Sequence, residues 1–212
     1  MRQTSLEWPW SSRAGGRSST EFEMLRDEVL NCKRCALHKT RTNVVFGEGP
    51  KDAEIMLVGE APGRQEDNSG RPFVGAAGKF LTEALNSAGI ERKEVYITNV
   101  VKCRPPGNRT PNEIEIRTCS PYLVRQIEII KPKVICALGA VASSFLLPRY
   151  CGTRPRAMRY IAGKVFSCKV QVALGHTLQA VLVTYHPAAA IYNPGLKEKI
   201  KEHISLLGDL VR

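Results

Sequence analysis

The sequence predicts an α/β fold in which helices cover both faces of a mostly parallel sheet. Apolar runs rich in β-branched residues alternate along the chain with segments of helical periodicity, an order typical of parallel sheets. The runs are almost continuously apolar, which indicates strands that are buried on both faces. The four expected strands are Ile55–Val58, Val95–Val101, Val134–Leu138 and Val181–Tyr185.

Segments with helical start and stop signals lie between and around these runs. The expected helices are residues 21–31, Lys79–Ala88, Thr110–Ile130, Ala140–Leu147 and Leu196–Val211. Pro111 at the first helical position and Glu113, three residues after a Thr110 cap, predict where the longest helix begins. Gly89 and Pro148 are stop signals for the second and fourth helices.

The chain is long enough, at 212 residues, for one well-buried domain. Residues 1–20 are expected to be a disordered extension, because Ser11–Ser19 is rich in Ser, Arg and Gly, and residues 21–212 to form the single domain. Within it, we interpret Tyr160–Leu174 as an inserted β-hairpin or an edge strand. No apolar stretch approaches the roughly 20 residues of a membrane helix, and the N-terminus lacks an apolar signal core. We therefore expect a cytoplasmic protein.

The chain is strongly basic. It carries 31 Lys and Arg against 20 Asp and Glu, a formal net charge of +11. Such a surplus favours a polyanionic partner, of which nucleic acid is the commonest. Charge alone does not decide this, because many basic proteins bind no nucleic acid.

Polar side chains follow three of the four expected strands. Glu60 follows the first, Asn99 lies near the end of the second, and His186 follows the fourth. The crevice beyond the carboxyl ends of the strands is where ligands bind in open α/β sheets. The loop after the first strand also contains further carboxylates, including Glu66, and a lone aromatic residue, Phe73. Carboxylates beside an aromatic ring suit the recognition of a flat, polar ring.

Four cysteines have the spacing of a metal site. Cys32 and Cys35 form a Cys-x-x-Cys pair after the expected N-terminal helix, Cys103 follows the second strand, and Cys119 lies on the longest helix. Such a set can bind zinc or an iron–sulfur cluster, and the spacing does not separate the two. A redox pair is disfavoured because it normally follows a strand. The basic residues around the four cysteines suggest an element that contacts DNA: Lys33, Arg34, Lys39, Arg41, Lys102 and Arg104.

The other cysteines and one glycine motif are left outside the site. Cys136 lies in an apolar strand and is expected in the core, whereas Cys151 and Cys168 can be core, free or paired. The segment Gly75–Lys79 superficially matches a phosphate-binding P-loop. Phe73 and Phe80 replace the first glycine and the hydroxyl residue of that motif, so we reject an ATP site.

Four linked motifs resemble the family 4 uracil-DNA glycosylases, which are iron–sulfur members of the uracil glycosylase superfamily. The motifs are Gly59–Gly63, Gly70–Gly75, Thr98–Pro111 and His186–Ala189, and they occur in the family's order and spacing. The likeness extends from about Asn31 to the C-terminal helix. It implies a three-layer αβα fold with a central four-stranded parallel sheet. It also implies an enzyme of base excision repair that flips uracil out of DNA and hydrolyses its N-glycosidic bond.

The resemblance also assigns roles to individual residues. Cys32, Cys35, Cys103 and Cys119 match the ligands of a [4Fe-4S] cluster, which favours iron–sulfur over zinc. The residues that match the uracil site are Glu60, Ala61, Pro62, Phe73, Asn99 and His186. Among them Phe73 stacks on the base, Asn99 reads its polar edge and His186 faces O2. Asn108 matches a second asparagine linked to activity, so Glu60, His186 and Asn108 are the expected catalytic residues.

One position departs from the wider superfamily. Ala61 stands where its best-known enzymes carry an aspartate that orients the attacking water. The expected water-orienting carboxylate is therefore Glu60 or Glu66, and a site without such a carboxylate is the remaining alternative. The basic loop Pro105–Arg109 is a candidate for gripping phosphates, and Ala188–Tyr192 is a candidate wedge that fills the vacated base stack.

The expected partner is uracil-containing DNA, single- or double-stranded, bound by a monomer associated with the nucleoid. Three alternatives remain from the residues alone. They are a non-catalytic nucleic-acid-binding module with a structural metal, a redox iron–sulfur protein, and a glycosylase that acts on hypoxanthine or mismatched bases.

Overall fold

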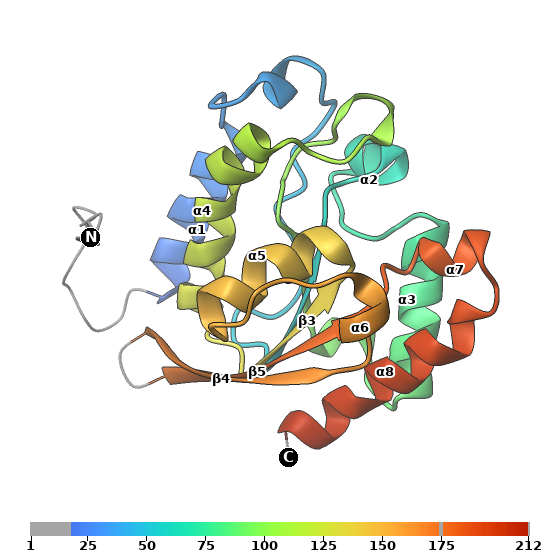
Figure 1. Cartoon of the computed structure of the whole chain (residues 1–212). Helices are drawn as coiled ribbons and strands as arrows, with labels where there is room; N and C mark the ends of the chain where they lie inside the picture. The colour runs from blue at the N-terminus through green and yellow to red at the C-terminus, as the bar shows by residue number, and fades with distance from the viewer. Residues whose placement is uncertain (1–17, 174–175, 212) are drawn as a thin grey trace.

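A five-stranded sheet runs through the computed structural model, which describes residues 18–173 and 176–211 (Figure 1). The strands are β1 (Ile55–Gly59), β2 (Tyr96–Asn99), β3 (Val134–Leu138), β4 (Val165–Ala173) and β5 (His176–Thr184). Their order is β2-β1-β3-β5-β4, in which only β4 runs antiparallel to its neighbour. The predicted α/β class with a mostly parallel sheet is confirmed. The fifth strand is the edge strand predicted within Tyr160–Leu174.

Helices cover both faces of the sheet. One face is covered by α1 (Ser18–Leu30), α4 (Glu113–Ile130) and α5 (Ala140–Tyr150), and the other by α3 (Ala76–Ser87) and α8 (Leu196–Val211) (Figure 1). Short elements at the ends of the strands complete the fold. They are α2 (Arg64–Ser69), α6 (Met158–Ile161), α7 (Ala189–Tyr192) and the 3-10 turns η1 (Ala36–Lys39), η2 (Arg92–Glu94) and η3 (Pro106–Asn108).

Alternate residues of β1 enter two separate cores, because successive side chains of a strand point to opposite faces. Met56 and Val58 pack with α1, α4 and α5, whereas Ile55 and Leu57 pack with α3 and α8. Both faces are therefore buried, as the continuous apolar runs predicted. Cys136 of β3 is fully buried in the second core, which confirms its predicted place.

The helix boundaries differ from the sequence prediction by more than one residue at four ends, one of which is the start of α3 at Ala76 instead of Lys79. Helix α4 begins at Glu113 rather than after Thr110, because Asn112 is the cap. The Asn112 side chain accepts a hydrogen bond from the backbone N–H of Glu115, and the Glu115 carboxylate accepts one from the backbone N–H of Asn112. Helix α5 continues past Pro148 to Tyr150. Helix α1 begins at Ser18, and the rest of the expected N-terminal extension, residues 1–17, lies outside the described residues.

Cys151 and Cys168, whose state the sequence left open, form a disulfide that joins the end of α5 to β4.

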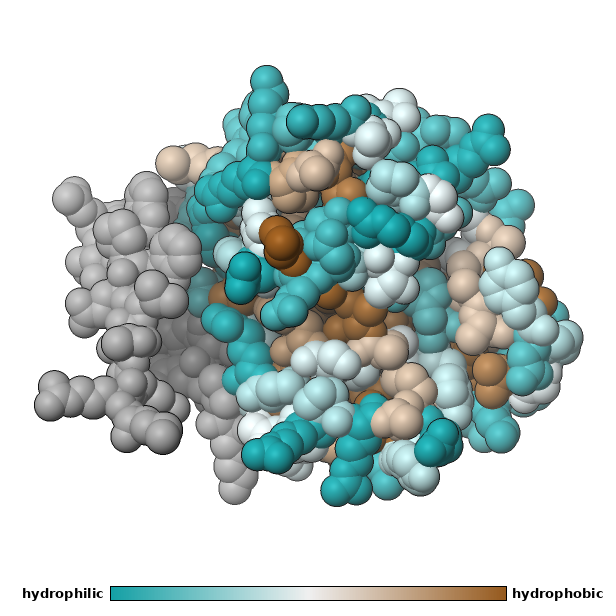
Figure 2. Space-filling model, turned by 45° about the horizontal axis from the view of Figure 1, so that its top comes forward, coloured by the Kyte–Doolittle hydropathy of each residue, from teal (hydrophilic) through white to brown (hydrophobic). Residues whose placement is uncertain are grey.

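None of the described helices is long and apolar enough to span a membrane. Figure 2 shows the face that lies at the top of Figure 1: hydrophilic side chains cover most of it, and hydrophobic ones are visible mainly in recesses between them.

Candidate active site

Three predicted site residues lie at the carboxyl ends of the parallel strands. Glu60 directly follows β1, Asn99 is the last residue of β2, and His186 comes two residues after β5. Gly59 is the strand partner of Asn99 in the register of β1 and β2. Because the carboxyl ends of parallel strands lie side by side, the three side chains emerge along this one edge of the sheet, the edge formed by the strand ends.

The Phe73 ring lies close to both the amide of Asn99 and the imidazole of His186. A Cβ atom placed on Gly59 would lie 2.4 Å from Asn99 Oδ1 and 2.6 Å from Phe73 Cζ, so the amide and the ring meet over this glycine. On its other side, the Phe73 ring lies 5.6 Å from the His186 ring, at an interplanar angle of 31°. Asn99, Phe73 and His186 therefore belong to one site.

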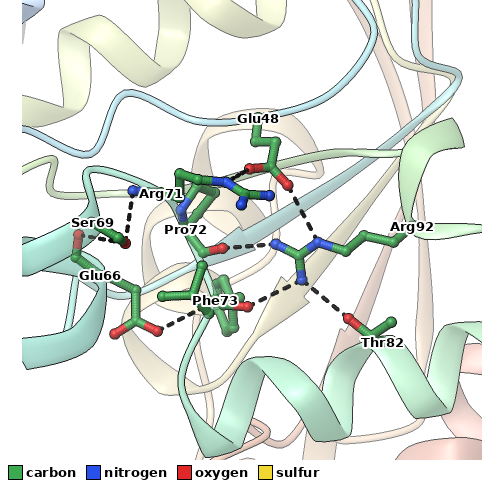
Figure 3. A network of polar contacts seen from close by, with 9 residues as sticks. Glu48, Glu66, Ser69, Arg71, Pro72, Phe73, Thr82 and Arg92 are labelled. Carbon is green, nitrogen blue, oxygen red and sulfur yellow. Dashed lines mark hydrogen bonds and ion pairs between the residues drawn. The ribbon is translucent and has the colours of Figure 1, made fainter.

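Phe73 adopts a backbone conformation that a side-chain-bearing residue rarely takes. Its φ of 50° is left-handed, at a cost on the order of 1–3 kcal/mol. Glu66 Oε1 accepts from the backbone N–H groups of Val74 and Gly75, both at 2.9 Å, and Arg92 binds the same segment from the other side (Figure 3). The surrounding contacts thus hold the strained segment.

The glycines of the rejected P-loop motif have a packing role. A Cβ atom on Gly78 would lie 1.8 Å from the carbonyl oxygen of Phe73, a distance that only glycine allows. At Gly75 a Cβ atom would lie 2.6 Å from Gln65 Oε1. Both positions permit a tight approach between the Phe73 segment and the start of α3.

Asn99 carries a buried acceptor without a protein partner. The residue is 1% exposed, and its Oδ1 atom has no hydrogen-bond partner within the described part of the chain. A buried polar atom left unpaired costs about 1–3 kcal/mol, and such atoms in native proteins require an explanation. A ligand that brings an N–H donor to this point would supply the missing bond.

His186 is held neutral with its proton on Nε2. The backbone N–H of Ala188 donates to Nδ1 at 3.2 Å, so Nδ1 is an acceptor in this tautomer. Desolvation lowers the pKa of His186 to about 4, and the nearby carboxylate of Glu66 opposes this shift only in part. At neutral pH the imidazole therefore offers one N–H donor and no charge.

The two candidate carboxylates have different surroundings. Glu66 uses Oε1 to bind two backbone amides, which commits it to the Phe73 segment. Glu60 is half-buried, and desolvation raises its pKa although the side chain of Thr110 acts in the opposite direction. Of the other residues expected to line the site, Pro62 is buried and Ala61 is half-buried in the loop between β1 and α2.

Asn108 lies on the exposed loop after β2. Its Oδ1 accepts from Arg104 Nε at 2.6 Å, and no hydrogen bond, ion pair or ring contact between described residues joins it to Phe73, Asn99 or His186. The same loop is anchored to α4 by Arg109, whose guanidinium binds both carboxylate oxygens of Glu115 at 2.7 and 2.8 Å. Asn108 thus makes no direct contact with these three residues, although Thr110 of the same loop interacts with Glu60.

Lys102, one of the basic residues expected to belong to a DNA-contacting element, is instead buried. It is 1% exposed, and Nζ donates to Thr98 Oγ1, to the Asn99 carbonyl and to Gln126 Oε1 at 2.5 to 2.8 Å. Burial lowers the pKa of Lys102 to about 7. By binding the main chain of Asn99, the side chain fixes the end of β2. A single lysine directly after an apolar strand was the available signal in the sequence.

The four predicted ligand cysteines line one small cavity between α1, η1 and α4. Arg41 Nη1 donates to Cys103 Sγ at 3.1 Å, and the backbone N–H of Lys102 donates to Cys119 Sγ at 3.2 Å. Burial raises the pKa of Cys103 and, to about 12, that of Cys119. Among the described residues no three His, Cys, Asp or Glu side chains converge as ligands of a single metal ion.

The basic residues near this cavity are less available than the sequence suggested. Lys102 is buried, and Arg34 is paired with Glu28 at 2.6 Å and lies over the ring of Tyr122. Arg41 is engaged with Cys103. These three cations therefore contact other residues of the cavity wall and do not remain as free surface charges.

Comparisons with known proteins agree with this geometry. A family model described as the uracil DNA glycosylase superfamily matches residues 46–207. The chain is 48% identical over 190 residues to a type-4 uracil-DNA glycosylase of Sulfurisphaera tokodaii, covering 89% of this chain and 84% of the relative. It is 47% identical over 183 residues to the type-4 enzyme of Archaeoglobus fulgidus (86% and 89%). A type-5 uracil-DNA glycosylase of Pyrobaculum aerophilum is 33% identical over 162 residues (69% and 66%).

We expect His186 to stay neutral well below the pH at which histidine normally titrates. Its proton-bound form is disfavoured by burial, so protonation should occur only near pH 4. Heteronuclear NMR of the ring nitrogens should show the Nε2–H tautomer unchanged between pH 8 and about pH 5.5. A transition near pH 6.5 would show that the imidazole is solvated and not held as described.

Proposed function

Because this chain belongs to the uracil DNA glycosylase superfamily, we propose that it removes uracil from DNA by hydrolysing the N-glycosidic bond, leaving an abasic site for base excision repair. The supporting observation is the unpartnered Oδ1 of Asn99, buried beside the Phe73 ring and on the same sheet edge as His186. This set offers a stacking surface, a base-reading amide and a neutral donor to one flat ring.

Asn99 selects uracil through its hydrogen-bonding pattern. Its Oδ1 accepts from N3–H of uracil, which satisfies the orphan acceptor, and its amide N–H donates to O4. Cytosine presents the opposite pattern at these two atoms. Binding cytosine would leave buried groups unpaired, a penalty that can support discrimination of about 10⁴-fold.

Phe73 stabilises the base after it leaves the duplex. Flipping costs a few kcal/mol, and stacking on an aromatic ring recovers on the order of 1–3 kcal/mol. The candidate wedge for the vacated stack can now be narrowed within Ala188–Tyr192. Ala190 is buried, whereas Ile191 is 48% and Tyr192 88% exposed, and this exposure supports Tyr192 as the proposed wedge.

His186 stabilises the leaving base. As the bond breaks, negative charge builds up on the pyrimidine, and O2 is the atom that His186 faces in this family. The Nε2–H donor is already oriented because Ala188 fixes the tautomer through Nδ1. A fixed donor of this kind typically supplies roughly 2.7–4 kcal/mol of transition-state stabilisation.

Glu60 orients the water that attacks the sugar. Ala61 cannot do so, and Glu66 is committed to the backbone of the Phe73 segment. Glu60 keeps part of its surface accessible, and its raised pKa makes its carboxylate a stronger base than usual. The carboxylate form is the active one, so activity should fall as the pH drops through this raised pKa.

Cys32, Cys35, Cys103 and Cys119 fit a [4Fe-4S] cluster. All four thiols line one cavity, and two of the sulfur atoms receive N–H donors from Arg41 and the Lys102 backbone, as is common around iron–sulfur centres. When bound, the cluster would supply a cross-link that ties the end of α1 to the loop after β2 and to α4. The cysteines thereby shape the protein around the DNA-facing edge.

A basic segment beside the site is proposed to bind DNA phosphates. Residues 129–197 contain nine Lys and Arg and no Asp or Glu. Within this stretch Arg154, Arg156, Arg159 and Lys164 are exposed and, in the described part of the chain, form no ion pair. The part of the chain that carries these four residues is hydrogen-bonded to β5, the strand that leads to His186: the Gly163 N–H donates to the carbonyl of Val183.

The same proposal covers the organisation of the protein. Residues 21–212 act as one glycosylase domain, to which Ser18–Thr20 belong as the start of α1, and the protein works as a monomer on single- or double-stranded DNA in the cytoplasm, beside the nucleoid. Asn108, on the loop expected to grip phosphates, is proposed as a catalytic residue together with Glu60 and His186.

Purified protein should release uracil from a uracil-bearing oligonucleotide, measured by alkaline cleavage of the abasic product. His186→Ala should lower the single-turnover rate by about 10²–10³-fold while DNA affinity stays within a few-fold, because only the transition state loses its donor. No release by the wild type would refute the function. Equal losses of rate and affinity would contradict the role of His186.

Asn99→Asp should lower the preference for uracil over cytosine by on the order of 100-fold, since a carboxylate cannot donate to O4. The measurement is the ratio of single-turnover rates on matched uracil and cytosine substrates. Asn193→Asp, at an exposed asparagine after α7, is the control and should leave the ratio unchanged. An unaltered ratio in Asn99→Asp would exclude Asn99 as the base reader.

Cys119→Ser should reduce the iron content below the roughly four atoms per chain of the intact cluster and weaken the visible absorption. Cys136→Ala is the matched control, because Cys136 is buried in β3 away from the cavity. Iron analysis of anaerobically purified protein provides the readout. Zinc in place of iron, or full iron in Cys119→Ser, would contradict the assignment.

Replacing Arg154, Arg156 and Arg159 together with Ala should make DNA binding less sensitive to salt. Each lost phosphate contact reduces the slope of log affinity against log salt by about 0.7–0.9, so the total change is about 2 to 3. Lys133→Ala serves as the control, because Lys133 precedes β3 at the opposite edge and is paired with Glu54. An unchanged slope in the triple variant would place the phosphate contacts elsewhere.

A further inference from the structure

Arg92 binds two consecutive carbonyl groups of the Phe73 segment. Its Nη2 donates to the Pro72 oxygen at 2.7 Å and its Nη1 to the Phe73 oxygen at 3.1 Å (Figure 3). In an extended chain, consecutive carbonyls point in opposite directions. Here both face one guanidinium, in a segment where Phe73 has a left-handed φ of 50°.

Arg92 is itself held in place by the fold. Its Nη1 also donates to Thr82 Oγ1 of α3 at 3.2 Å, and its Nε lies 3.4 Å from Glu48 Oε1. The backbone of Glu48 exchanges two hydrogen bonds with Ile97 of β2, so the carboxylate is fixed to the sheet. The Arg92 side chain is 19% exposed, which protects these bonds from solvent.

A carboxylate completes the clamp from the opposite direction. Glu66 Oε1 accepts from the N–H groups of Val74 and Gly75, which follow Phe73. The carbonyls at and before Phe73 thus accept from a guanidinium (Figure 3), and the N–H groups after Phe73 donate to a carboxylate. Between these two clamps the ring is directed over Gly59 and toward His186.

We propose that Arg92 is a positioning residue that holds the Phe73 ring in its base-stacking orientation from outside the site. Arg92 lies on η2, and its bonds go to the backbone of the Phe73 segment, to Thr82 and to Glu48. The inference rests on the proposed function, in which Phe73 stacks on uracil. It adds a residue that acts on base binding only through another side chain.

The planar guanidinium is required for this role. Its fixed fork reaches two backbone carbonyls, a hydroxyl and a carboxylate at once, whereas the point charge of a lysine cannot span them. Arg92→Lys should therefore behave like Arg92→Ala in base binding although it keeps the charge. This separates positioning from a general electrostatic effect.

The test compares inhibition by free uracil with affinity for abasic-site DNA, which lacks the base. Arg92→Ala and Arg92→Lys should raise the inhibition constant of uracil by on the order of tenfold, the range of one lost stacking contact. Affinity for abasic-site DNA should stay within about twofold, because the phosphate contacts are untouched. Equal weakening of both would overturn the proposal.

A double-mutant cycle with Phe73→Ala supplies a readout that a merely structural role would not move. If Arg92 acts through the Phe73 ring, Arg92→Ala should change uracil inhibition less than about twofold in the Phe73→Ala background. Independent, multiplicative effects would overturn the proposal. Arg125→Ala, which removes an ion pair with Glu28 far from the site, controls for general destabilisation and should leave uracil inhibition unchanged.

Two further measurements keep the proposal testable. If Arg92→Ala fails to fold, Glu48→Gln weakens the anchor of Arg92 more gently and should raise the uracil inhibition constant in the same direction; no change would overturn the proposal. Nuclear Overhauser contacts between the Phe73 and His186 rings should be present in the wild type and reduced in Arg92→Lys. If the wild-type protein does not excise uracil, the proposed function is refuted. If the ring contacts remain intact in Arg92→Lys, only the positioning role is refuted.

Discussion

The absence of a side chain at Gly59 sets the geometry of the whole site. Strand pairing places Gly59 opposite Asn99, and the Phe73 ring packs into the same space from the loop after β1. A single methyl group there would lie within 2.6 Å of both partners. The amide and the ring can meet only because this position carries none, and His186 then closes the set from β5.

Around this point the protein fixes nearly every polar group before a ligand arrives. Glu66 and Arg92 hold the Phe73 backbone, Ala188 fixes the His186 tautomer, and Lys102 binds the carbonyl of Asn99. The Oδ1 of Asn99 is the buried site atom left without a partner among the described residues. Such preorganisation lets binding free energy go into recognition rather than into ordering side chains.

Lys102 also links the site to the cysteine cavity. Its side chain binds the end of β2, while its backbone N–H donates to Cys119 Sγ and its chain neighbour is Cys103. One residue therefore contacts both the cysteine cavity and the backbone of Asn99.

The sequence predicted the features that depend on local pattern. Apolar runs, helix signals and strand ends are encoded by neighbours in the chain, so the sheet, its covering helices and the placement of Asn99 and His186 were foreseeable. Arg92 and Lys102 were not, because their roles arise from contacts with carbonyls and side chains brought together only by the fold. The start of α4 was misplaced because Asn112 and Thr110 are both acceptable caps, and only the Glu115 side chain decides between them. The Cys151–Cys168 pairing likewise depends on proximity between α5 and β4.

The charges are also divided unevenly between the two halves of the sheet. Nine Lys and Arg and no acidic residue lie in residues 129–197, which contain β3, β4 and β5. This stretch accounts for nine of the eleven net positive charges, so the attraction of a polyanion acts mainly on the part of the chain that contains β3, β4 and β5. Encounters would begin with the correct side turned toward the polyanion, so fewer collisions are wasted on rotational search.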